Sequence, residues 1–234
     1  PASLPTVILG FVVVAIPAFL VIKQPDLGTA ILIAASGLVV IFFAGMSWRV
    51  IIMLAGLLAA AAPLGWYLIH DYQRQRILTL FDPWSDPLGA GYHTIQSAIA
   101  VGSGGMYGKG WLNGSQSQLD FIPERSTDFI FAVFSEEFGF IGSMILLLAY
   151  LFVIGRSLYI AIEAKDSYTR LLCGSLAVTF AIYVFVNIGM VTGILPIVGV
   201  PLPLISYGGT SMVSLMAGFG ILMSAYSNRW FMHS

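Results

Sequence analysis

Three carboxylates stand close together in a segment that is otherwise almost entirely apolar. Asp128, Glu136 and Glu137 lie within the run STDFIFAVFSEEFG, which covers residues 126–139. Carboxylates that border an apolar medium are costly unless they face a partner or a water-filled cavity. Partial desolvation raises the pKa of a carboxylate and makes it a stronger base. The segment therefore has the residue types for general base chemistry at a membrane edge, with Asp128 as the candidate base.

A structural interpretation of Asp128 competes with the catalytic one. Ser126 or Thr127 could cap a helix that begins here, and Asp128 would then lie in or beside its first turn, where an acid is favoured. If that helix continues to the glutamates, Asp128 and Glu136 lie about 80° apart around its axis, and Glu137 points to the opposite side. At most one glutamate therefore shares a face with Asp128, and the residues alone leave both interpretations open.

Two further polar stretches could line a site. In KQPDLGTA, residues 23–30, Asp26 stands at the start of a helix, where it either caps the helix or lines an outward-facing polar cavity. Five glycines between residues 102 and 110 are typical of a chain built for turns, whose amides and Lys109 could approach an anion. No strand precedes that stretch, so it is not a phosphate-binding P-loop.

Residues that commonly bind metals are few and scattered. His70, His93 and His233 are far apart in the chain and show no metal-ligand spacing. Cys173 is the single cysteine and lies in an apolar run, so we expect it to contribute packing rather than chemistry. The sequence thus shows no metal-binding motif.

The composition indicates what kind of fold must position these groups. Hydrophobic residues make up 58% and charged residues 9% of the 234 positions, with a mean hydropathy of +0.91. A soluble domain carries about 25% charged residues. A chain with so few charges cannot coat a water-facing surface, so we expect an all-α polytopic membrane protein. The net charge of −1 gives no reason to expect nucleic acid as a partner.

Six apolar runs come close to the roughly 20 residues that a helix needs to cross a bilayer. We expect membrane-spanning helices at Leu4–Ile22, Thr29–Met46, Val50–Ile69, Phe138–Ile154, Leu171–Ile194 and Thr210–Ala225. For the fourth helix, a start before Phe138 stays open. A long polar connection, residues 71–127, separates the third helix from the fourth, and its length indicates a functional role. Within it, Gly91–Ala100 is expected to form a short interfacial helix, with an irregular lid as the alternative. The segment Gly155–Arg170 is expected to be a loop.

The charges of the short connections predict the orientation. One side of the six predicted helices carries five basic residues in its connections and tail, namely Arg49, Arg156, Lys165, Arg170 and Arg229. By the positive-inside rule that side is cytoplasmic, and the connection 71–127 faces outward. These observations leave two classes open: an enzyme that acts at the outer face of the membrane, and a transporter with a polar vestibule.

Four sequence blocks resemble the signature blocks of the SEDS family (shape, elongation, division and sporulation). The blocks are QPDLGTA (24–30), DPLGAGYHTIQSAIAVGSGG (86–105), GKGWLNGSQSQLDFIPERSTDFIFAVFSEEFG (108–139) and GVPLPLISYGG (199–209). Two more stretches, HDYQRQRI (70–77) and FVNIGMVTGILPIVGVPLPL (185–204), are similar to the branch of the family that serves cell elongation. The resemblance extends over essentially the whole chain.

The resemblance implies a fold and a location. Family members have about ten transmembrane helices, and this sequence resembles the last six. We therefore expect residues 1–234 to be a fragment that forms a single integral membrane domain in the bacterial cytoplasmic (inner) membrane. Residues 71–127 match the family's large extracytoplasmic loop. A basic loop that is thought to help the family bind its lipid-linked substrate precedes the matched part, so the fragment alone is expected to be inactive.

The activity that the resemblance implies is that of a peptidoglycan glycosyltransferase of cell elongation. Such an enzyme polymerises lipid II into glycan strands at the outer face of the membrane, by inverting displacement of undecaprenyl pyrophosphate. The implied partners are lipid II, membrane lipid, a class B penicillin-binding protein and the elongation machinery, with no nucleic acid. No cofactor is required by the sequence, although a divalent cation, Mg²⁺ or Mn²⁺, could assist the pyrophosphate.

The functional residues of the family can be carried over by position. Its essential aspartate matches Asp128, the predicted general base. Substrate-binding residues are predicted at Asp26, Lys109, Glu124 and Arg125. Among these, Lys109 and Arg125 would bind the pyrophosphate, and Asp26 would line the cavity. A position in the large loop that is linked to activation matches Asp120, where many relatives carry Glu.

Two other functions stay as alternatives for the same sequence. One is a lipid II flippase, and the other is a scaffold that recruits the penicillin-binding protein. Of the eleven acidic residues, only Glu163 and Asp166 fall on the predicted cytoplasmic side. This distribution favours chemistry at the outer face over a path through the membrane.

Overall fold

The chain folds into helices joined by turns. The computed structural model describes residues 4–24, 26–68, 71–89, 91–119, 121–122 and 124–231, and no strand occurs among them. The helices are α1 (Leu4–Ile22), α2 (Leu27–Phe43), α3 (Trp48–Leu68), α4 (Asp71–Phe81), the 3₁₀ helix η1 (Pro83–Ser85), α5 (Tyr92–Ser103), α6 (Ser115–Gln118), α7 (Ile130–Glu163), α8 (Ser167–Val191) and α9 (Gly209–Phe231). The expectation of an all-α fold is confirmed.

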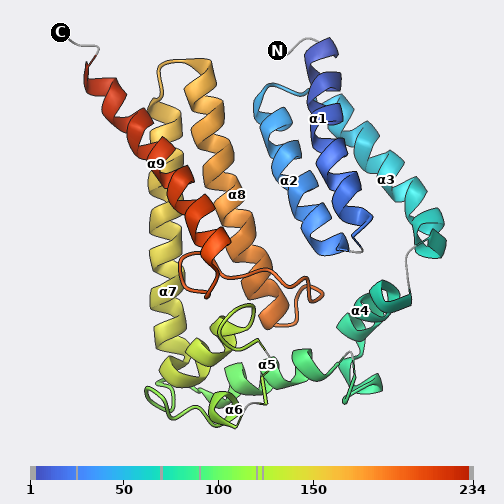
Figure 1. The fold of residues 1–234 in the computed structure, drawn as a ribbon, viewed down its shortest axis with the longest axis vertical. Helices are drawn as coiled ribbons and strands as arrows, with labels where there is room; N and C mark the ends of the chain where they lie inside the picture. The colour runs from blue at the N-terminus through green and yellow to red at the C-terminus, as the bar shows by residue number, and fades with distance from the viewer. Residues whose placement is uncertain are drawn as a thin grey trace.

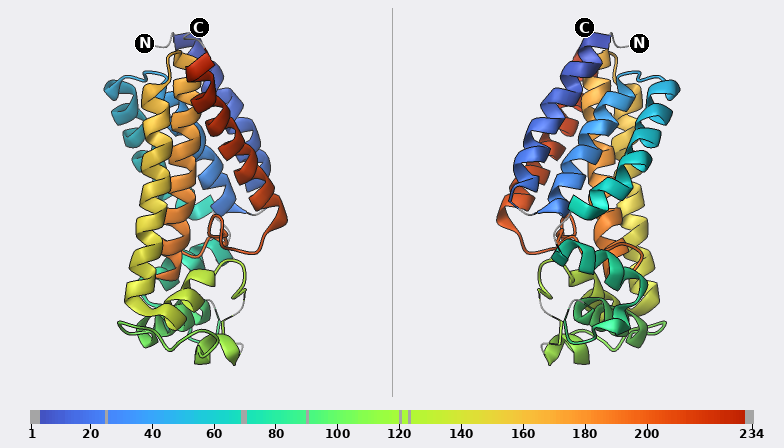
Figure 2. Two further views of the ribbon diagram at one scale, coloured as in Figure 1. Left: turned by 90° about the vertical axis from the view of Figure 1, so that its left-hand side faces the viewer. Right: turned by 90° about the vertical axis from the view of Figure 1, so that its right-hand side faces the viewer.

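Six long helices run roughly along the long axis of the molecule, and the shorter helices α4, α5 and α6 gather at one end (Figure 1). α1 packs against α2, α2 against α8, and α8 against α7 and α9. The connections from α1 to α2 and from α8 to α9 lie at the same end as α4–α6, whereas α9 ends at the opposite one (Figures 1 and 2). The fold therefore brings three connections that are distant in sequence to one end of the bundle.

Four of the long helices, α1, α7, α8 and α9, are long and apolar enough to cross a membrane. α2 and the described apolar part of α3 are shorter, so the count of six spans stays a prediction. α1 has the predicted bounds, and the predicted ranges of α2, α3, α8 and α9 overlap most of the observed helices. Hydropathy and length thus located these helices well.

The fourth predicted helix was wrong at its C-terminal end. α7 begins at Ile130, consistent with the earlier start that the prediction left open, but it continues past Ile154 to Glu163, and the expected loop Gly155–Arg170 shrinks to residues 164–166. The charged residues that suggested a loop lie on the helix instead, because a long side chain can pack along its neighbours while its charged end reaches a favourable position. The guanidinium of Arg156, for example, lies 5.1 Å from the ring centre of Tyr159.

The connection 71–127 is built largely from helices rather than as an irregular lid. α5 confirms the short helix that was expected at Gly91–Ala100. It packs against α7 and α8, with Ile95, Ser97 and Ala100 buried. This packing fixes the connection to the bundle, whereas its interfacial position and its place outside the membrane stay predictions.

α7 is interrupted at Gly139, whose φ of 66° and ψ of −163° are not helical. In a continuous helix, the N–H groups of residues 140 and 141 would bond to the carbonyls of residues 136 and 137. The break separates these groups, and polar backbone groups that are left unpaired in apolar surroundings are costly. Another part of the chain must therefore supply partners.

The glycine-rich loop 105–110 takes the place of the missing helical bonds. The replacement bonds run from Lys109 N to Glu136 O (3.0 Å), from Gly110 N to Glu137 O (3.0 Å), from Phe140 N to Gly105 O (2.8 Å) and from Ile141 N to Met106 O (3.1 Å). We call this arrangement the clasp: residues 105–110 bound to residues 136–141. It ties the connection between α3 and α7 to the middle of a long helix.

Replacing Gly139 by alanine should open the clasp. A Cβ at this position would lie 2.3 Å from the amide nitrogen of Gly108, and the backbone conformation of Gly139 is accessible essentially to glycine alone. Backbone strain alone should lower the free energy of unfolding of Gly139→Ala by about 1–3 kcal/mol. Thermal and denaturant unfolding in detergent measure the change.

The matched control is Gly155→Ala on the same helix. A Cβ there would meet no atom within 4 Å, so this variant should be neutral or slightly stabilised, as helical Gly→Ala changes usually are. Equal losses of stability in Gly139→Ala and Gly155→Ala would contradict the clasp as a stabilising contact.

Candidate functional site

Asp128 lies in a turn immediately before α7 rather than on the helix. Phe129 is the N-cap residue and makes no side-chain capping bond. Asp128 thus lies beside the first turn, as expected, but the expectations that Ser126 or Thr127 caps the helix and that Asp128 is a capping acid were wrong. The reason is that Thr127 bonds backwards: its hydroxyl donates to the Glu124 carboxylate at 2.8 Å, and its N–H donates to the Glu124 carbonyl at 3.1 Å.

The carboxylate of Asp128 is half-buried and faces no donor. Among the described residues, none donates a hydrogen bond to it. Burial raises the pKa of Asp128, and the negative charge of Glu124 raises this pKa further. Gly199 lies opposite, where an added Cβ would come within 3.4 Å of Asp128 Oδ2. A carboxylate with a raised pKa and no donors is well suited to accept a proton from a bound molecule.

The turn that carries Asp128 is joined to the connection between α8 and α9. The hydroxyl of Ser206 donates to the Thr127 carbonyl at 2.5 Å, and the N–H of Tyr207 donates to the Ser126 carbonyl at 2.9 Å. The side-chain amide of Asn187 on α8 donates to the Asp128 carbonyl at 2.8 Å. These bonds hold the Asp128 turn against the C-terminal end of α8.

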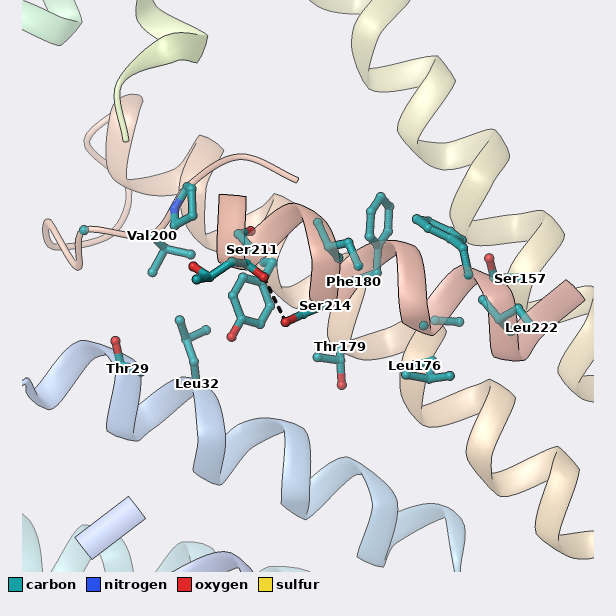
Figure 3. A pocket seen from close by; sticks show the side chains of 18 residues that line it. Thr29, Leu32, Ser157, Leu176, Thr179, Phe180, Val200, Ser211, Ser214 and Leu222 are labelled. Atoms are coloured by element: carbon teal, nitrogen blue, oxygen red, sulfur yellow. Dashed lines mark hydrogen bonds between the residues drawn. The ribbon is translucent and has the colours of Figure 1, made fainter. Parts of the chain in front are cut away.

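An apolar cavity of about 450 Å³ begins at this junction. α2, α7, α8 and α9 and the segment Gly199–Pro201 line it, and its polar groups are hydroxyls, such as those of Thr29, Ser211 and Ser214. Figure 3 shows Thr29 and Leu32 of α2 facing the α9 serines across the space. Asp128 does not itself line the cavity, but Gly199 does, and Gly199 also faces the Asp128 carboxylate. A single residue therefore links the candidate base to the end of the cavity.

Glu136 does not share a site with Asp128. Its side chain is fully buried and forms an ion pair with Lys109, with Nζ and Oε1 2.7 Å apart. The same oxygen accepts from the Ser115 hydroxyl at 3.2 Å and from the Gln116 N–H at 3.1 Å. The predicted angle between Asp128 and Glu136 does not apply, because Asp128 precedes the helix. The three carboxylates of the segment therefore do not form one cluster, and Glu136 has a structural partner.

Lys109 is part of the clasp. Its Nζ donates both to Glu136 and to the Ser115 hydroxyl at 2.8 Å, and its side chain is 31% exposed. Its backbone N–H, with that of Gly110, bonds to α7 rather than cradling an anion. The structure thus gives Lys109 an internal partner, and its role toward pyrophosphate stays a prediction.

The other predicted site residues lie at the same end of the molecule. Asp26 caps α2 by accepting from Thr29 N–H at 3.0 Å, so the capping interpretation of Asp26 is confirmed. The start of α2 also packs on the connection that ends at Gly199, since a Cβ on Gly28 would come within 2.3 Å of Val198. Glu124 and Arg125 are exposed in the turn before Asp128. Asp120 lies outside the described residues.

Two residues that contact neighbours of the site were not predicted from the sequence: His93, which packs on Phe129, and Arg76, which bonds to the α8–α9 connection. The His93 ring of α5 stacks on Phe129, with ring centres 5.7 Å apart. Burial lowers the pKa of His93 and the charge of Arg76 lowers it further, which favours a neutral imidazole. Arg76 of α4 donates to the Ile197 carbonyl at 3.1 Å. No spacing in the sequence indicates these contacts, because α4, α5 and the α8–α9 connection meet only in the folded chain.

The described residues contain no group of three His, Cys, Asp or Glu side chains that could hold a metal ion. The carboxylates around the candidate base are thus Asp128 itself and Glu124, and the described part of the chain offers no preformed metal cage. Any assistance from Mg²⁺ or Mn²⁺ stays a prediction.

The fold and the site together define a polytopic helical membrane protein. Its polar site lies where an apolar cavity reaches the end of the bundle at which α4, α5 and α6 gather. Comparison with known proteins narrows this class. The chain matches the FtsW/RodA/SpoVE family, described as cell cycle proteins, over residues 1–229, and it belongs to that family. The resemblance to the SEDS family is confirmed.

Two curated relatives illustrate the similarity. The chain is 57% identical over 230 residues to the peptidoglycan glycosyltransferase MrdB of Escherichia coli (strain K12), covering 98% of this chain and 62% of that protein. It is 41% identical over 208 residues to the stage V sporulation protein E of Bacillus subtilis (strain 168), covering 88% of this chain and 56% of that protein. The chain therefore spans about three fifths of the length of these relatives.

Solved structures show the same fold. A chain from a peptidoglycan synthase complex that coordinates polymerization and crosslinking superposes with a TM-score of 0.78 at 34% identity, covering 95% of this chain and 62% of that one. The rod shape determining protein RodA of Thermus thermophilus superposes with a TM-score of 0.64 at 27% identity, covering 98% and 59%.

The ion pair between Lys109 and Glu136 yields a stability prediction. Lys109→Met leaves a fully buried carboxylate without its cation, so the free energy of unfolding should fall by about 3–5 kcal/mol. Adding Glu136→Met should restore most of the loss, because two apolar side chains then replace the pair. Unfolding in detergent measures both variants, with the exposed Lys23→Met as the surface control. A double variant that is no more stable than Lys109→Met would contradict this role.

Proposed function

We propose that the protein is a peptidoglycan glycosyltransferase of cell elongation, which polymerises lipid II at the outer face of the bacterial cytoplasmic membrane. The observation that carries the proposal is that Gly199, at the end of an apolar cavity, faces Asp128, a carboxylate that accepts no hydrogen bond from the described residues. A substrate with a sugar head and a long hydrocarbon tail matches this combination. The similarity to a peptidoglycan glycosyltransferase of Escherichia coli and to a chain of a peptidoglycan synthase complex supports the same activity.

In the proposed reaction, Asp128 acts as the general base. It takes the proton from the 4-hydroxyl of the acceptor sugar as that oxygen attacks the anomeric carbon of the donor. The bond from that carbon to the pyrophosphate breaks, and undecaprenyl pyrophosphate leaves with the electron pair. A single displacement converts an α-linked donor into a β-1,4 product. A base with a raised pKa provides more driving force for the proton transfer than an ordinary aspartate.

The lipid tail would enter the cavity beside α2, α8 and α9, whose lining is largely apolar. The pyrophosphate would then lie at the mouth, near the exposed Arg125. Arg76, fixed by its bond to the Ile197 carbonyl, adds a second cation on the same side. We propose Arg125 and Arg76 as pyrophosphate contacts, with Asp26 and Glu124 at the rim and Lys109 contributing through the clasp. A bound Mg²⁺ or Mn²⁺ would neutralise charge on the leaving pyrophosphate.

The proposed topology has six membrane spans in this chain, with residues 71–127 outside the cell. A class B penicillin-binding protein is the proposed partner, because a structural relative belongs to a complex that couples polymerization to crosslinking. Asp120 is proposed to serve regulation by that partner, on the resemblance of its position to the family's activation site.

The activity can be tested with fluorescent lipid II and the purified intact protein. Wild type should form glycan polymer, and Asp128→Ala should slow polymerisation by about 10²–10⁴-fold, the usual contribution of a general base. Gel separation of the products measures both. Normal polymer from Asp128→Ala would refute the base assignment, and transbilayer movement of lipid II without polymer would favour a flippase.

The pH dependence of the reaction should report the charge of Glu124. Asp128 must be ionised to act, so kcat/KM should fall as the pH drops through its raised pKa. Glu124→Gln keeps the acceptor for Thr127 but removes the negative charge that raises the pKa of Asp128. The acid limb of the kcat/KM profile should therefore move to lower pH. Asp71→Asn, an exposed carboxylate paired with Arg74, is the control and should leave the limb in place.

A further inference from the structure

The side chain of Asn187 bonds both to the backbone of the candidate base and to the backbone of a residue that lines the cavity. It lies near the end of α8 and is fully buried. Its amide nitrogen donates to the Asp128 carbonyl at 2.8 Å and to the Val200 carbonyl at 2.6 Å.

The two bonds fix which way the amide faces. A flipped side chain would place its oxygen against two carbonyl oxygens, which repel it. In the observed orientation, Asn187 Oδ1 is buried and has no hydrogen-bond partner among the described residues. Burying an unsatisfied acceptor is destabilising, so packing alone would favour an apolar side chain such as leucine here. The two hydrogen bonds that the amide donates are what an apolar side chain could not provide at this position.

We propose that Asn187 is a positioning residue for glycosyl transfer. It holds the backbone of Asp128 at a fixed separation from Val200. The Asp128 carboxylate is thereby kept at the right distance from the reacting hydroxyl of a substrate that lies in the cavity. This inference rests on the proposed function. Misplacement of a reacting group by about 1 Å can cost about 100-fold in rate, which is the scale of effect that such a residue controls.

Tyr150 offers a matched comparison within the same region. It is also buried, and its hydroxyl donates to the Pro203 carbonyl at 2.7 Å. It therefore braces the α8–α9 connection with one strong hydrogen bond but does not touch the Asp128 turn. Losing this bond should weaken the α8–α9 connection while leaving the hydrogen bond between Asn187 and the Asp128 carbonyl in place.

The experiment compares Asn187→Leu with Tyr150→Phe in the intact protein, using lipid II polymerisation and thermal unfolding. Asn187→Leu should lower kcat by about 100-fold with KM within about twofold of wild type, because the substrate still binds while the base is misplaced. Tyr150→Phe should keep kcat within about threefold of wild type. Both are assayed below their unfolding temperatures, so that loss of folded protein does not contribute.

Asn187→Ser covers the case in which the leucine variant does not fold. A serine in a helix bonds to the carbonyl of its own preceding turn, so it removes both contacts without adding bulk or charge. It should show the same fall in kcat at unchanged KM. Wild-type kcat in Asn187→Ser, or equal falls in the position-187 variants and Tyr150→Phe, would overturn the proposal.

Asp128→Ala in the same assay distinguishes failure of the proposed base from failure of the positioning role of Asn187. If Asp128→Ala polymerises normally, the proposed base fails, and the positioning role fails with it. If Asp128→Ala is inactive but Asn187→Leu behaves like Tyr150→Phe, only the positioning role fails.

Discussion

The break in α7 at Gly139 is the constraint on which the site end of the molecule depends. An interrupted helix in apolar surroundings must find partners for its freed backbone groups, and the loop 105–110 supplies them. The same contact neutralises Glu136 with Lys109. One junction therefore satisfies both the backbone and a buried charge, and α5, which leads into this loop, is held against α7 and α8. The turn that carries Asp128 leads directly into the short first segment of α7, whose far end this junction fixes.

Two carboxylates of one short segment thus have opposite environments. One oxygen of Glu136 accepts from an ammonium group, two hydroxyls and a backbone N–H. Asp128 receives no donor from the described residues, while its backbone is held from the far side by Asn187. A saturated carboxylate stabilises a structure, whereas an unsatisfied one with a raised pKa is available for proton transfer. Environment rather than residue type assigns these roles.

Sequence reasoning recovered the fold more fully than the site. Length and hydropathy located α1 at its observed bounds, but they shortened α7, because its charged ends resemble a loop until their partners are known. Motif resemblance singled out Asp128, although only the structure excluded a helix cap there. The pairing of Lys109 with Glu136, and the approach of His93 and Asn187 to the site, join segments distant in sequence. No periodicity within one helix encodes such contacts, so they became visible only once the helices were packed.

The clasp also has a mechanical consequence. Tyr107 lies within the loop 105–110 and Trp111 follows it directly; both are exposed, and the Trp111 ring packs edge-on against Phe138 of α7. A protein that bound these rings would contact a loop that is held firmly against α7 rather than a loose one. Its push or pull would pass through four backbone hydrogen bonds into α7 on both sides of the break. A force on the loop 105–110 would thus be transmitted to the short helical segment of α7 that begins next to Asp128, with little bending of the loop.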